Sequence, residues 1–458
     1  MAGEVTASRA AVWARCDHPA EVLVACRTAA TAEAVRATAP AAPARDLTAR
    51  LVLESLQPAR TYRCTVDCRL DGSADVAHRA VDLTFTTAPT PDTPAPVRFA
   101  WGGDVGGQNV CRDRARGYPI FNTLAAQRPD FFVGLGDMIY ADDPCRPVGR
   151  YGNQQVPGPP AATSVSDFWA VWKYHREDAA FRSFAATTPY YAVWDDHEVA
   201  NDFGPHHDTG RGDDNPEQQH LLQPGLQAFL DYNPFPPETD TSHTLYRTVR
   251  WGRHVELFLL DLRQYRDSNA APDADSRPKS MLGAAQRAWL EERLRASDAT
   301  WKIIVTSVPL AIPTGDPHRG RDGWANLGES TGFERELLGL LRVMQRQGIR
   351  NHLWISTDVH FSAVFRHTPF ADDPSFQFYE VETGPLNAGV FPKQEFDTTL
   401  HPERLFLFPA ACNARADFRE AMSWFTFGLI RVDAAGVLTV DVVNTAGETL
   451  FSRTLTPR

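Results

Sequence analysis

Aspartate residues follow the strand-like segments of this sequence. Five apolar runs each end in at least one: Asp104 after FAWGG, Asp137 after FFVGLG, Asp195 and Asp196 after YYAVW, Asp261 after LFLL, and Asp358 after LWIST. A single aspartate at such a point most often caps a helix or forms a turn. The carboxyl ends of strands meet at one edge of an α/β sheet, however, and carboxylates gathered there repel one another unless cations neutralise them. The sequence therefore predicts a metal centre at a sheet edge.

Other types of metal ligand stand close to these aspartates. They are Tyr140 in GLGDMIY, His197 and Asn201 in WDDHEVAND, and His360 in STDVHF. In an extended segment residues i and i+2 face the same way, so Asp358 and His360 can both point into one site. Carboxylate and phenolate oxygens suit hard cations such as ferric iron and calcium, whereas a single imidazole suits iron, zinc or manganese equally well. The sequence has no cluster of cysteines of the kind that binds structural zinc.

The first 86 residues show the alternation of apolar and polar residues that is typical of strands. It is visible in AAVWARC, EVLVACRT, TYRCTVDCRL and VDLTFTT, with turn-forming segments such as CDHPAE between the runs. Short strands spaced by turns predict a small antiparallel β-sandwich over residues 1–86. Residues 87–97, TAPTPDTPAPV, contain four prolines and are interpreted as a stiff linker between two domains.

From residue 98 to residue 458 buried strand patterns alternate with helical patterns. The clearest helical segments are AAQRAWLEERLRAS and GFERELLGLLRVMQRQG. This alternation predicts an α/β fold in which helices flank a sheet core. The Pro- and Gly-rich stretch 143–166 is expected to be a loop or lid, and 206–216 is expected to be a loop.

Composition narrows the classes of partner and the location. The net charge is −11, from 46 basic and 57 acidic residues, and no long basic run occurs, so a nucleic-acid-binding face is not expected. No apolar stretch is long enough for a transmembrane helix, and the first residues lack the apolar core of a signal peptide. A cytoplasmic location is the default expectation, although an exported protein whose signal had been removed would look the same.

The seven cysteines leave at least one thiol without an intramolecular partner. Four of them, Cys16, Cys26, Cys64 and Cys68, fall in the strand-rich first region, where a disulfide is an open alternative. A chain of this length can bury a full core without cross-links, so reduced thiols are the preferred expectation.

The order of the motifs GGDVGG, GDMIY, WDDHE and TDVHF resembles that of the PhoD-like alkaline phosphatase D family of the metallophosphoesterase superfamily. Supporting segments are LDLRQYR (260–266), MLGAAQRAWLEERL (281–294), GFERELL (332–338) and ETGPLNAG (382–389). Each motif is weak alone, but the ordered set spans nearly the whole chain. The resemblance implies a four-layer αββα metallophosphoesterase sandwich with metals at its rim, preceded by a fibronectin-like antiparallel β-sandwich.

The resemblance also implies a role for each site residue. The iron-like position takes Asp104, Asp137, Tyr140 and His360, and the second position takes Asp137, Asp196, Asp358 and, as an addition, Asn201. Asp137 thus bridges the two positions. His197 stands where the superfamily has a histidine that stabilises the phosphoryl group or protonates the leaving oxygen.

Two departures from the family pattern bear on the metals. Asp104 stands where characterised members have a cysteine ligand to iron, and TSVPL (306–310) lacks the histidine that many superfamily members carry before the proline. A carboxylate is a harder ligand than a thiolate, and an oxygen-rich second position favours calcium, magnesium or manganese. Ferric iron and calcium are therefore the expected cofactors, with manganese, magnesium and zinc as alternatives.

The expected reaction is hydrolysis of a small phosphate monoester or diester. Two metals would polarise the phosphoryl oxygens and activate a hydroxide that attacks phosphorus, with His197 as the acid for the leaving group. Arg263 is a possible substrate contact, but an ion pair with Asp261 is the favoured interpretation, because buried arginines are usually paired. Two alternatives stay open: a phospholipase D-type phosphodiesterase, and a non-catalytic, metal-stabilised binding or scaffold protein.

Overall fold

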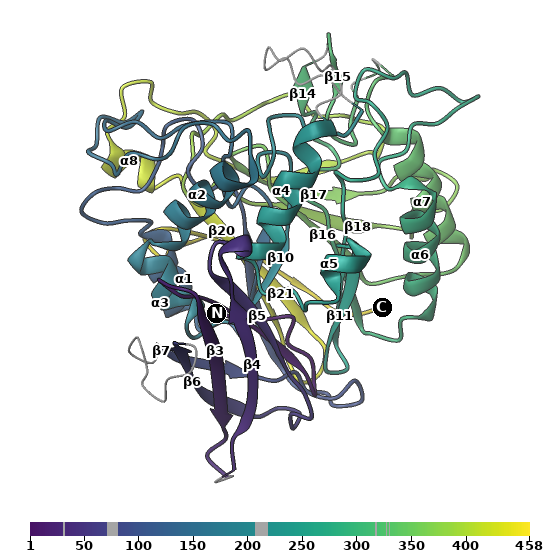
Figure 1. Ribbon diagram of the computed structural model, residues 1–458. Helices are drawn as coiled ribbons and strands as arrows, with labels where there is room; N and C mark the ends of the chain where they lie inside the picture. The colour runs from purple at the N-terminus through teal and green to yellow at the C-terminus, as the bar shows by residue number, and fades with distance from the viewer. Residues whose placement is uncertain (31–32, 71–80, 207–218, 317, 327, 329) are drawn as a thin grey trace.

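The computed structural model describes residues 1–30, 33–70, 81–206, 219–316, 318–326, 328 and 330–458. Within these residues two large sheets pack face to face, and helices cover their outer faces (Figure 1). Except for its first residue, the loop expected at 206–216 lies outside the described residues. No helix in the described part of the chain has the length and apolar character needed to cross a membrane.

The first large sheet has the strand order β22-β21-β20-β8-β9-β10-β1-β2-β5 in the described residues. Its central strands are parallel and almost wholly apolar, as strands buried on both faces must be. They are β8 (Val97–Gly102), β9 (Phe131–Leu135) and β10 (Tyr190–Val193). An antiparallel edge follows, made of β20 (Thr426–Val432), β21 (Leu438–Asn444) and β22 (Thr449–Leu455).

The second large sheet has the order β11-β12-β13-β16-β18-β17-β19 in the described residues. Its parallel strands are β12 (Val255–Leu259), β13 (Trp301–Val305), β16 (His352–Ser356) and β18 (Phe378–Glu382). Antiparallel strands at the two sides are β11 (Arg247–Trp251), β17 (Ser362–His367) and β19 (Glu403–Phe408). A small separate hairpin joins β14 (Gly315–Asp316) to β15 (Gly320–Arg321).

An apolar layer holds the two sheets together. Phe99 and Leu135 from the first sheet belong to the same buried cluster as Leu257, Ile303 and Ile355 from the second. The outer face of the first sheet is covered by α1 (Ile120–Ala126), α2 (Val165–Arg176), α3 (Ala179–Ala185) and α4 (Gln219–Tyr232). The second is covered by α6 (Gly283–Ala296) and α7 (Glu334–Arg346) (Figure 1). The predicted four-layer αββα sandwich is confirmed.

Short elements complete the helices of the described residues. They are the 3-10 turn η1 (Pro43–Arg45), α5 (Thr239–Ser242) and α8 (Phe418–Met422). Among the long helices, α2 begins with a capping box in which Ser164 and Asp167 satisfy each other's backbone N–H groups. Helix α7 buries Leu337, Leu340 and Met344 at helical spacing, as its sequence pattern predicts.

The predicted N-terminal sandwich is present and shares a sheet with the rest of the protein. A sheet of β4 (Val35–Ala41), β3 (Ala20–Arg27), β6 (Thr61–Arg69) and β7 (Val81–Thr86) packs on β1 (Ala2–Gly3), β2 (Ala10–Arg15) and β5 (Thr48–Leu53). Strand β1 pairs with β10, with Gly3 opposite Tyr190. A Cβ atom at Gly3 would lie 2.2 Å from the Tyr190 carbonyl oxygen, so this junction requires glycine. The domain division at 87–97 stays a prediction.

Six of the seven cysteines form disulfides, so the expectation of reduced thiols is wrong. The pairs are Cys16–Cys68, Cys26–Cys64 and Cys111–Cys145. Cys26 and Cys64 face each other across β3 and β6, whose register places them 4.0 Å apart at Cα. Cys16 follows β2, so its bond to Cys68 ties the two sheets of the sandwich together. Strand register, which spacing along the chain does not reveal, brings these residues together.

We expect the denatured protein to expose one reactive thiol, that of Cys412, and seven after reduction. Reduction should also lower Tm, because each disulfide of this kind contributes about 2–4 kcal/mol to the free energy of unfolding. Thiol titration in guanidinium with and without reductant, followed by thermal unfolding of each sample, measures both effects. Seven reactive thiols in unreduced protein would contradict the three disulfides.

Candidate metal centre

Four strand ends meet at one edge of the paired sheets and bring the predicted aspartates together. Asp104 follows β8, Asp137 follows β9, Asp195 and Asp196 follow β10, and Asp358 follows β16. The first four are at most 2% exposed. Buried carboxylates at the carboxyl ends of parallel strands are the arrangement expected from the sequence.

The backbone turns sharply at several of these residues. The φ angles of Asp104, Asp137, Asp358 and His360 are 61°, 51°, 81° and 61°, in the left-handed region that residues with a Cβ rarely adopt. Such a conformation costs about 1 kcal/mol or more per residue and is found mainly where function requires it. The unfavourable backbone conformation at these residues therefore accompanies the positions that their side chains take in the cluster.

Among the described residues, four groups of acidic and histidine side chains have ligand atoms within 4.8 Å of one another; one consists of Asp196, Asp202 and Asp322, and the other three contain only residues predicted from the motifs. These three are Asp104, Asp137 and His360; Asp137, Asp196 and His197; and Asp195, Asp196 and Asp358. Asp137 belongs to the first two groups, as a bridging ligand must. This juxtaposition agrees with the ligand sets that the motifs imply, whose individual roles stay predictions.

The buried oxygens of this cluster fit a cation site. Both carboxylate oxygens of Asp104, and Oδ2 of Asp137, Asp195 and Asp358, accept no hydrogen bond within the described structure. Burial, and then repulsion from neighbouring aspartates, raises the pKa of the Asp104 and Asp137 carboxyl groups well above their usual range. Without a cation such carboxyl groups keep a proton, and a bound metal ion can take the place of the protons and bind the unpartnered oxygens.

The hydrogen bonds of His360 leave one ring nitrogen available to a metal. Its Nδ1 lies 2.6 Å from the Gly389 carbonyl oxygen, which can only accept, so Nδ1 carries the proton. Nε2 then faces the Tyr140 hydroxyl at 2.9 Å and Asp104 Oδ1 at 3.7 Å. Burial lowers the pKa of His360 to about 3, which keeps the ring neutral. A neutral imidazole fixed by a carbonyl is the usual form of a metal-binding histidine.

His197 is oriented by a residue that the motifs did not reveal. Its Nδ1 lies 2.7 Å from Asp142 Oδ1, and its ring packs 4.1 Å from that of Tyr140, centroid to centroid. Because Nδ1 is bonded to Asp142, Nε2 of His197 is the ring nitrogen that can bind a substrate or another group. Burial opposes protonation of His197, but the charges of Asp142 and Asp196 outweigh it and raise the pKa to about 10 in the metal-free chain. Asn201 is exposed, and its backbone N–H bonds Asp142 at 2.8 Å.

The expected ion pair of Arg263 with Asp261 is wrong. Asp261 accepts hydrogen bonds from the Trp194 ring N–H, the Gln264 amide and the backbone N–H of Arg263, but not from the Arg263 guanidinium. Arg263 is completely buried, and its guanidinium binds Asp195 at 2.6 Å and both oxygens of Asp322 at 2.8 Å. The arginine therefore braces the cluster through ion pairs, as expected, but its partners are Asp195 and Asp322, which lie far from it in the sequence. A contact between Arg263 and substrate stays a prediction.

Two further buried acids complete the frame of the cluster. Glu198, the last letter of WDDHE, accepts from the backbone N–H groups of Asp137, Met138 and Asp195 at 2.8–3.1 Å, and so joins the β9 and β10 loops. Asp322 comes from the loop after β15, where no sequence pattern indicated it. The position of Glu198 beside His197 in the motif was the available signal for its role.

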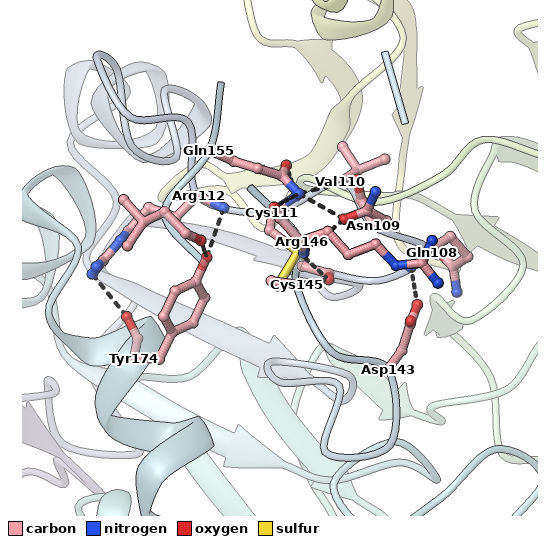
Figure 2. The surroundings of a disulfide bond; sticks show 12 residues. Gln108, Asn109, Val110, Cys111, Arg112, Asp143, Cys145, Arg146, Gln155 and Tyr174 are labelled. Carbon is pink, nitrogen blue, oxygen red and sulfur yellow. Dashed lines mark hydrogen bonds between the residues drawn. A yellow bond between two sulfur atoms is a disulfide. The ribbon is translucent and has the colours of Figure 1, made fainter. Parts of the chain in front are cut away.

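A disulfide clamps the two loops that carry Asp104 and Tyr140 (Figure 2). Cys111, seven residues after Asp104, is bonded to Cys145, five residues after Tyr140. The buried Gln155 side chain reinforces the clamp, accepting from the Cys111 N–H at 3.0 Å and donating to the Arg146 carbonyl at 2.8 Å. The disulfide therefore fixes the beginning of the stretch 143–166, which was expected to be a loop or lid. Helix α2 begins near its end, at Val165.

Comparison with known proteins places this site in a family context. The family model described as PhoD-like phosphatase matches residues 99–435. Alkaline phosphatase D of Bacillus subtilis (strain 168) is 24% identical over 302 residues, which cover 60% of this chain and 48% of that protein. The chain thus spans about half the length of this curated relative.

Two solved structures share the fold. The structure of PhoD superposes with a TM-score of 0.76 at 18% identity and covers 100% of this chain and 91% of that one. Purple acid phosphatase PPD1 from yellow lupin (Lupinus luteus) seeds superposes with a TM-score of 0.63 at 14% identity, covering 99% and 73% of the two chains. The resemblance inferred from the ordered motifs is confirmed. With the match extending over most of its length, this chain belongs to the PhoD-like phosphatase family.

Proposed function

We propose that the protein is a hydrolase that uses bound metal ions to cleave small phosphate esters. The observation that carries this proposal is the group of unpartnered, buried aspartate oxygens around Asp137, with His197 held beside it by Asp142. Family membership supports the same activity. Bound metal ions would supply the positive charge that a phosphate ester needs and would activate water for attack.

The residues of this chain have distinct tasks in that reaction. Asp104, Asp137, Tyr140 and His360 would hold one metal ion, and Asp137, Asp196 and Asp358, with Asn201 at the margin, would hold another. Asp142 holds His197 through Nδ1, so that Nε2 can donate to the phosphoryl or leaving oxygen. Arg263 and Glu198 keep the loops of β9 and β10 in place around the reacting group.

Ferric iron and calcium are the metals that we propose. The first group offers a phenol, a neutral imidazole and carboxylates, a donor set that suits iron. The group of Asp195, Asp196 and Asp358 offers oxygen alone, which suits calcium, magnesium or manganese. Burial and the charges of Asp137 and Asp104 raise the pKa of Tyr140 well above its usual range, so only a strong Lewis acid would ionise it.

We infer that the protein works in an oxidising compartment. The default expectation of a cytoplasmic location has no test in the fold, and the three disulfides support the alternative of an exported protein. Disulfides of this number are rare in proteins that stay in the reducing cytosol of mesophiles. Expression in an oxidising compartment should therefore give the fully cross-linked form.

Metal removal and replacement test the proposed activity. The protein stripped with a chelator should lose turnover of p-nitrophenyl phosphate, and iron with calcium should restore it more fully than zinc does. Bis-p-nitrophenyl phosphate, assayed in parallel, separates monoesterase from diesterase activity. Metal content measured before stripping identifies the native ions.

One result would overturn the proposal. If neither ester is cleaved with iron, calcium, manganese, magnesium or zinc supplied, the protein is not a phosphoesterase. A non-catalytic, metal-stabilised binding or scaffold protein would then be the favoured alternative. A strong preference for the diester, extended to phospholipid head groups, would instead identify the phospholipase D-type alternative.

A further inference from the structure

The segment that binds His360 continues outward as an aromatic wall. Gly389 accepts the Nδ1–H of His360, and two residues later Phe391 turns back over it. The Phe391 ring lies 5.6 Å from the His360 ring, centroid to centroid, and is 38% exposed, one of few large apolar side chains in the described residues to reach solvent. A single exposed apolar ring is common at a protein surface, but this one lies against a histidine of the candidate metal centre, where it can contact a bound substrate.

Two cations flank this wall without a carboxylate partner. The Arg150 guanidinium lies over the Phe391 ring, 4.7 Å from its centroid, and forms no hydrogen bond or ion pair with the described residues. Lys393 donates to the Pro313 carbonyl at 2.9 Å, and no described carboxylate lies within ion-pair distance of its ammonium group. The charges of both act on His360. The charges of Asp358 and Asp202 also act on Lys393 and partly offset its charge, whereas Arg150 is exposed at the surface.

We propose that Phe391, Arg150 and Lys393 form the subsite for the part of the substrate that lies beyond the reacting phosphorus. The occupant that fits is a flat aromatic group that carries a second negative charge. Phe391 would stack on the ring, and Arg150 and Lys393 would pair with the additional anion. This inference rests on the proposed function, because it assigns the specificity of the same site.

The chemistry of the three side chains selects this class over the alternatives. A guanidinium held over an aromatic face is desolvated on one side and keeps its N–H donors for an anion. The metal ions of the site would already neutralise the reacting phosphoryl group. A monoester with no other anionic group would therefore offer no partner to Arg150 and Lys393. An uncharged alkyl group would leave both cations unpaired and gain nothing from the ring.

Three esters with the same reacting group test the subsite: ethyl phosphate, phenyl phosphate and 4-carboxyphenyl phosphate. For each, the kcat/KM of a variant is divided by that of the unaltered protein, which cancels differences in leaving-group reactivity. Phe391→Ala should lower this ratio about tenfold for the two aromatic esters, mainly through KM, and less than twofold for ethyl phosphate.

Removing the cations should affect only the substrate that carries a carboxylate in addition to its phosphoryl group. Arg150→Met and Lys393→Met should each lower the ratio about fivefold for 4-carboxyphenyl phosphate at low salt, and the effect should shrink as ionic strength rises. Phenyl phosphate should change less than twofold. Arg253→Met is the matched control, since it removes one positive charge from an exposed residue on the β11–β12 turn, next to the linker.

The outcomes separate the two proposals. If the unaltered protein cleaves none of the esters with any metal, the proposed function itself fails. If it cleaves them but the three variants change all esters equally, or no more than Arg253→Met does, the subsite assignment is overturned while the hydrolase remains. Thermal unfolding of each variant checks that the fold is intact, and the ethyl phosphate rate provides the same check on the active centre.

Discussion

Asp137→Asn should lower phosphoesterase turnover by about a thousandfold or more and reduce the metal content of the purified protein. Asp137 lies in two of the four ligand groups found among the described residues, so its loss weakens both proposed metal positions together. Asparagine has almost the same shape and can still accept the His197 backbone N–H, which Asp137 accepts at 3.2 Å through Oδ1. The change therefore removes charge with little change in packing.

The same substitution should make the metal-free protein more stable. Burial, and then repulsion from Asp196, Asp195 and Glu198, raises the pKa of Asp137, which shows that the charged form is unfavourable there without a cation. Removing the charge should add about 1–2 kcal/mol to the free energy of unfolding in chelator near pH 8. Thermal unfolding with and without metal measures the effect, and added metal should raise the Tm of the unaltered protein more than that of the variant.

Asp92→Asn is a suitable control, because Asp92 is exposed in the linker and belongs to none of the ligand groups. It should change neither turnover nor stability. Unchanged turnover and metal content in Asp137→Asn would show that the site is wrongly assigned, even if the enzyme is a phosphoesterase. Lower stability of the metal-free variant would show that Asp137 is held by bonds other than those to a metal.

The aspartates at strand ends could be predicted because one local pattern specifies both their position and their direction. A buried parallel strand must be apolar, and the first polar residue after it necessarily lies at the carboxyl edge of the sheet. Asp104, Asp137 and Asp195 obey this rule. Asp261 obeys it equally well in sequence, yet its carboxylate is taken by Trp194 and Gln264. The local pattern cannot tell which edge residues face the junction of the two sheets.

The supporting residues could not be predicted because long-range packing selects them. Asp322 reaches Arg263 across 59 residues of sequence, from a loop with no periodicity. The disulfides depend on the register of β3 against β6 and on which sheet β2 joins. Strand β1 has only two residues, too few to show a pattern, yet it connects the sandwich to the central strands of the first large sheet. In each case the decisive contact is a property of the tertiary structure.

Arg263→Met should lower the free energy of unfolding by about 3–5 kcal/mol, the second large effect that we expect. Methionine fills much of the same volume but leaves Asp195 buried without its arginine partner and Asp322 with Arg266 alone. Although burial alone would raise it, the charges of Arg263 and Arg266 hold the pKa of Asp322 well below its usual range, so this carboxylate is ionised in the folded protein. A buried carboxylate that stays ionised after losing its bidentate arginine partner destabilises a core strongly, even where a second arginine remains.

Two companion variants show whether this cost comes from the charges. Arg263→Met combined with Asp322→Asn should recover part of the lost stability, because the second change removes the stranded anion. Arg342→Met should cost less than about 1 kcal/mol, since its bridge to Asp372 lies at the surface, with side chains 35% and 67% exposed. Chemical denaturation of the four proteins gives the comparison, and a double variant no more stable than Arg263→Met alone would refute the charge explanation.

Arg263→Lys distinguishes a brace from a substrate contact. Lysine keeps the positive charge but cannot bind both oxygens of Asp322 and also reach Asp195, because its ammonium group is a single point of charge. If Arg263 is a brace, the lysine variant should unfold at a lower denaturant concentration. Its kcat should fall by a larger factor than its KM rises, because the β10 loop that carries Asp196 and His197 loses its attachment to Arg263. If instead it bound substrate, KM would rise while stability stayed unchanged. The complete burial of Arg263 argues for the first outcome.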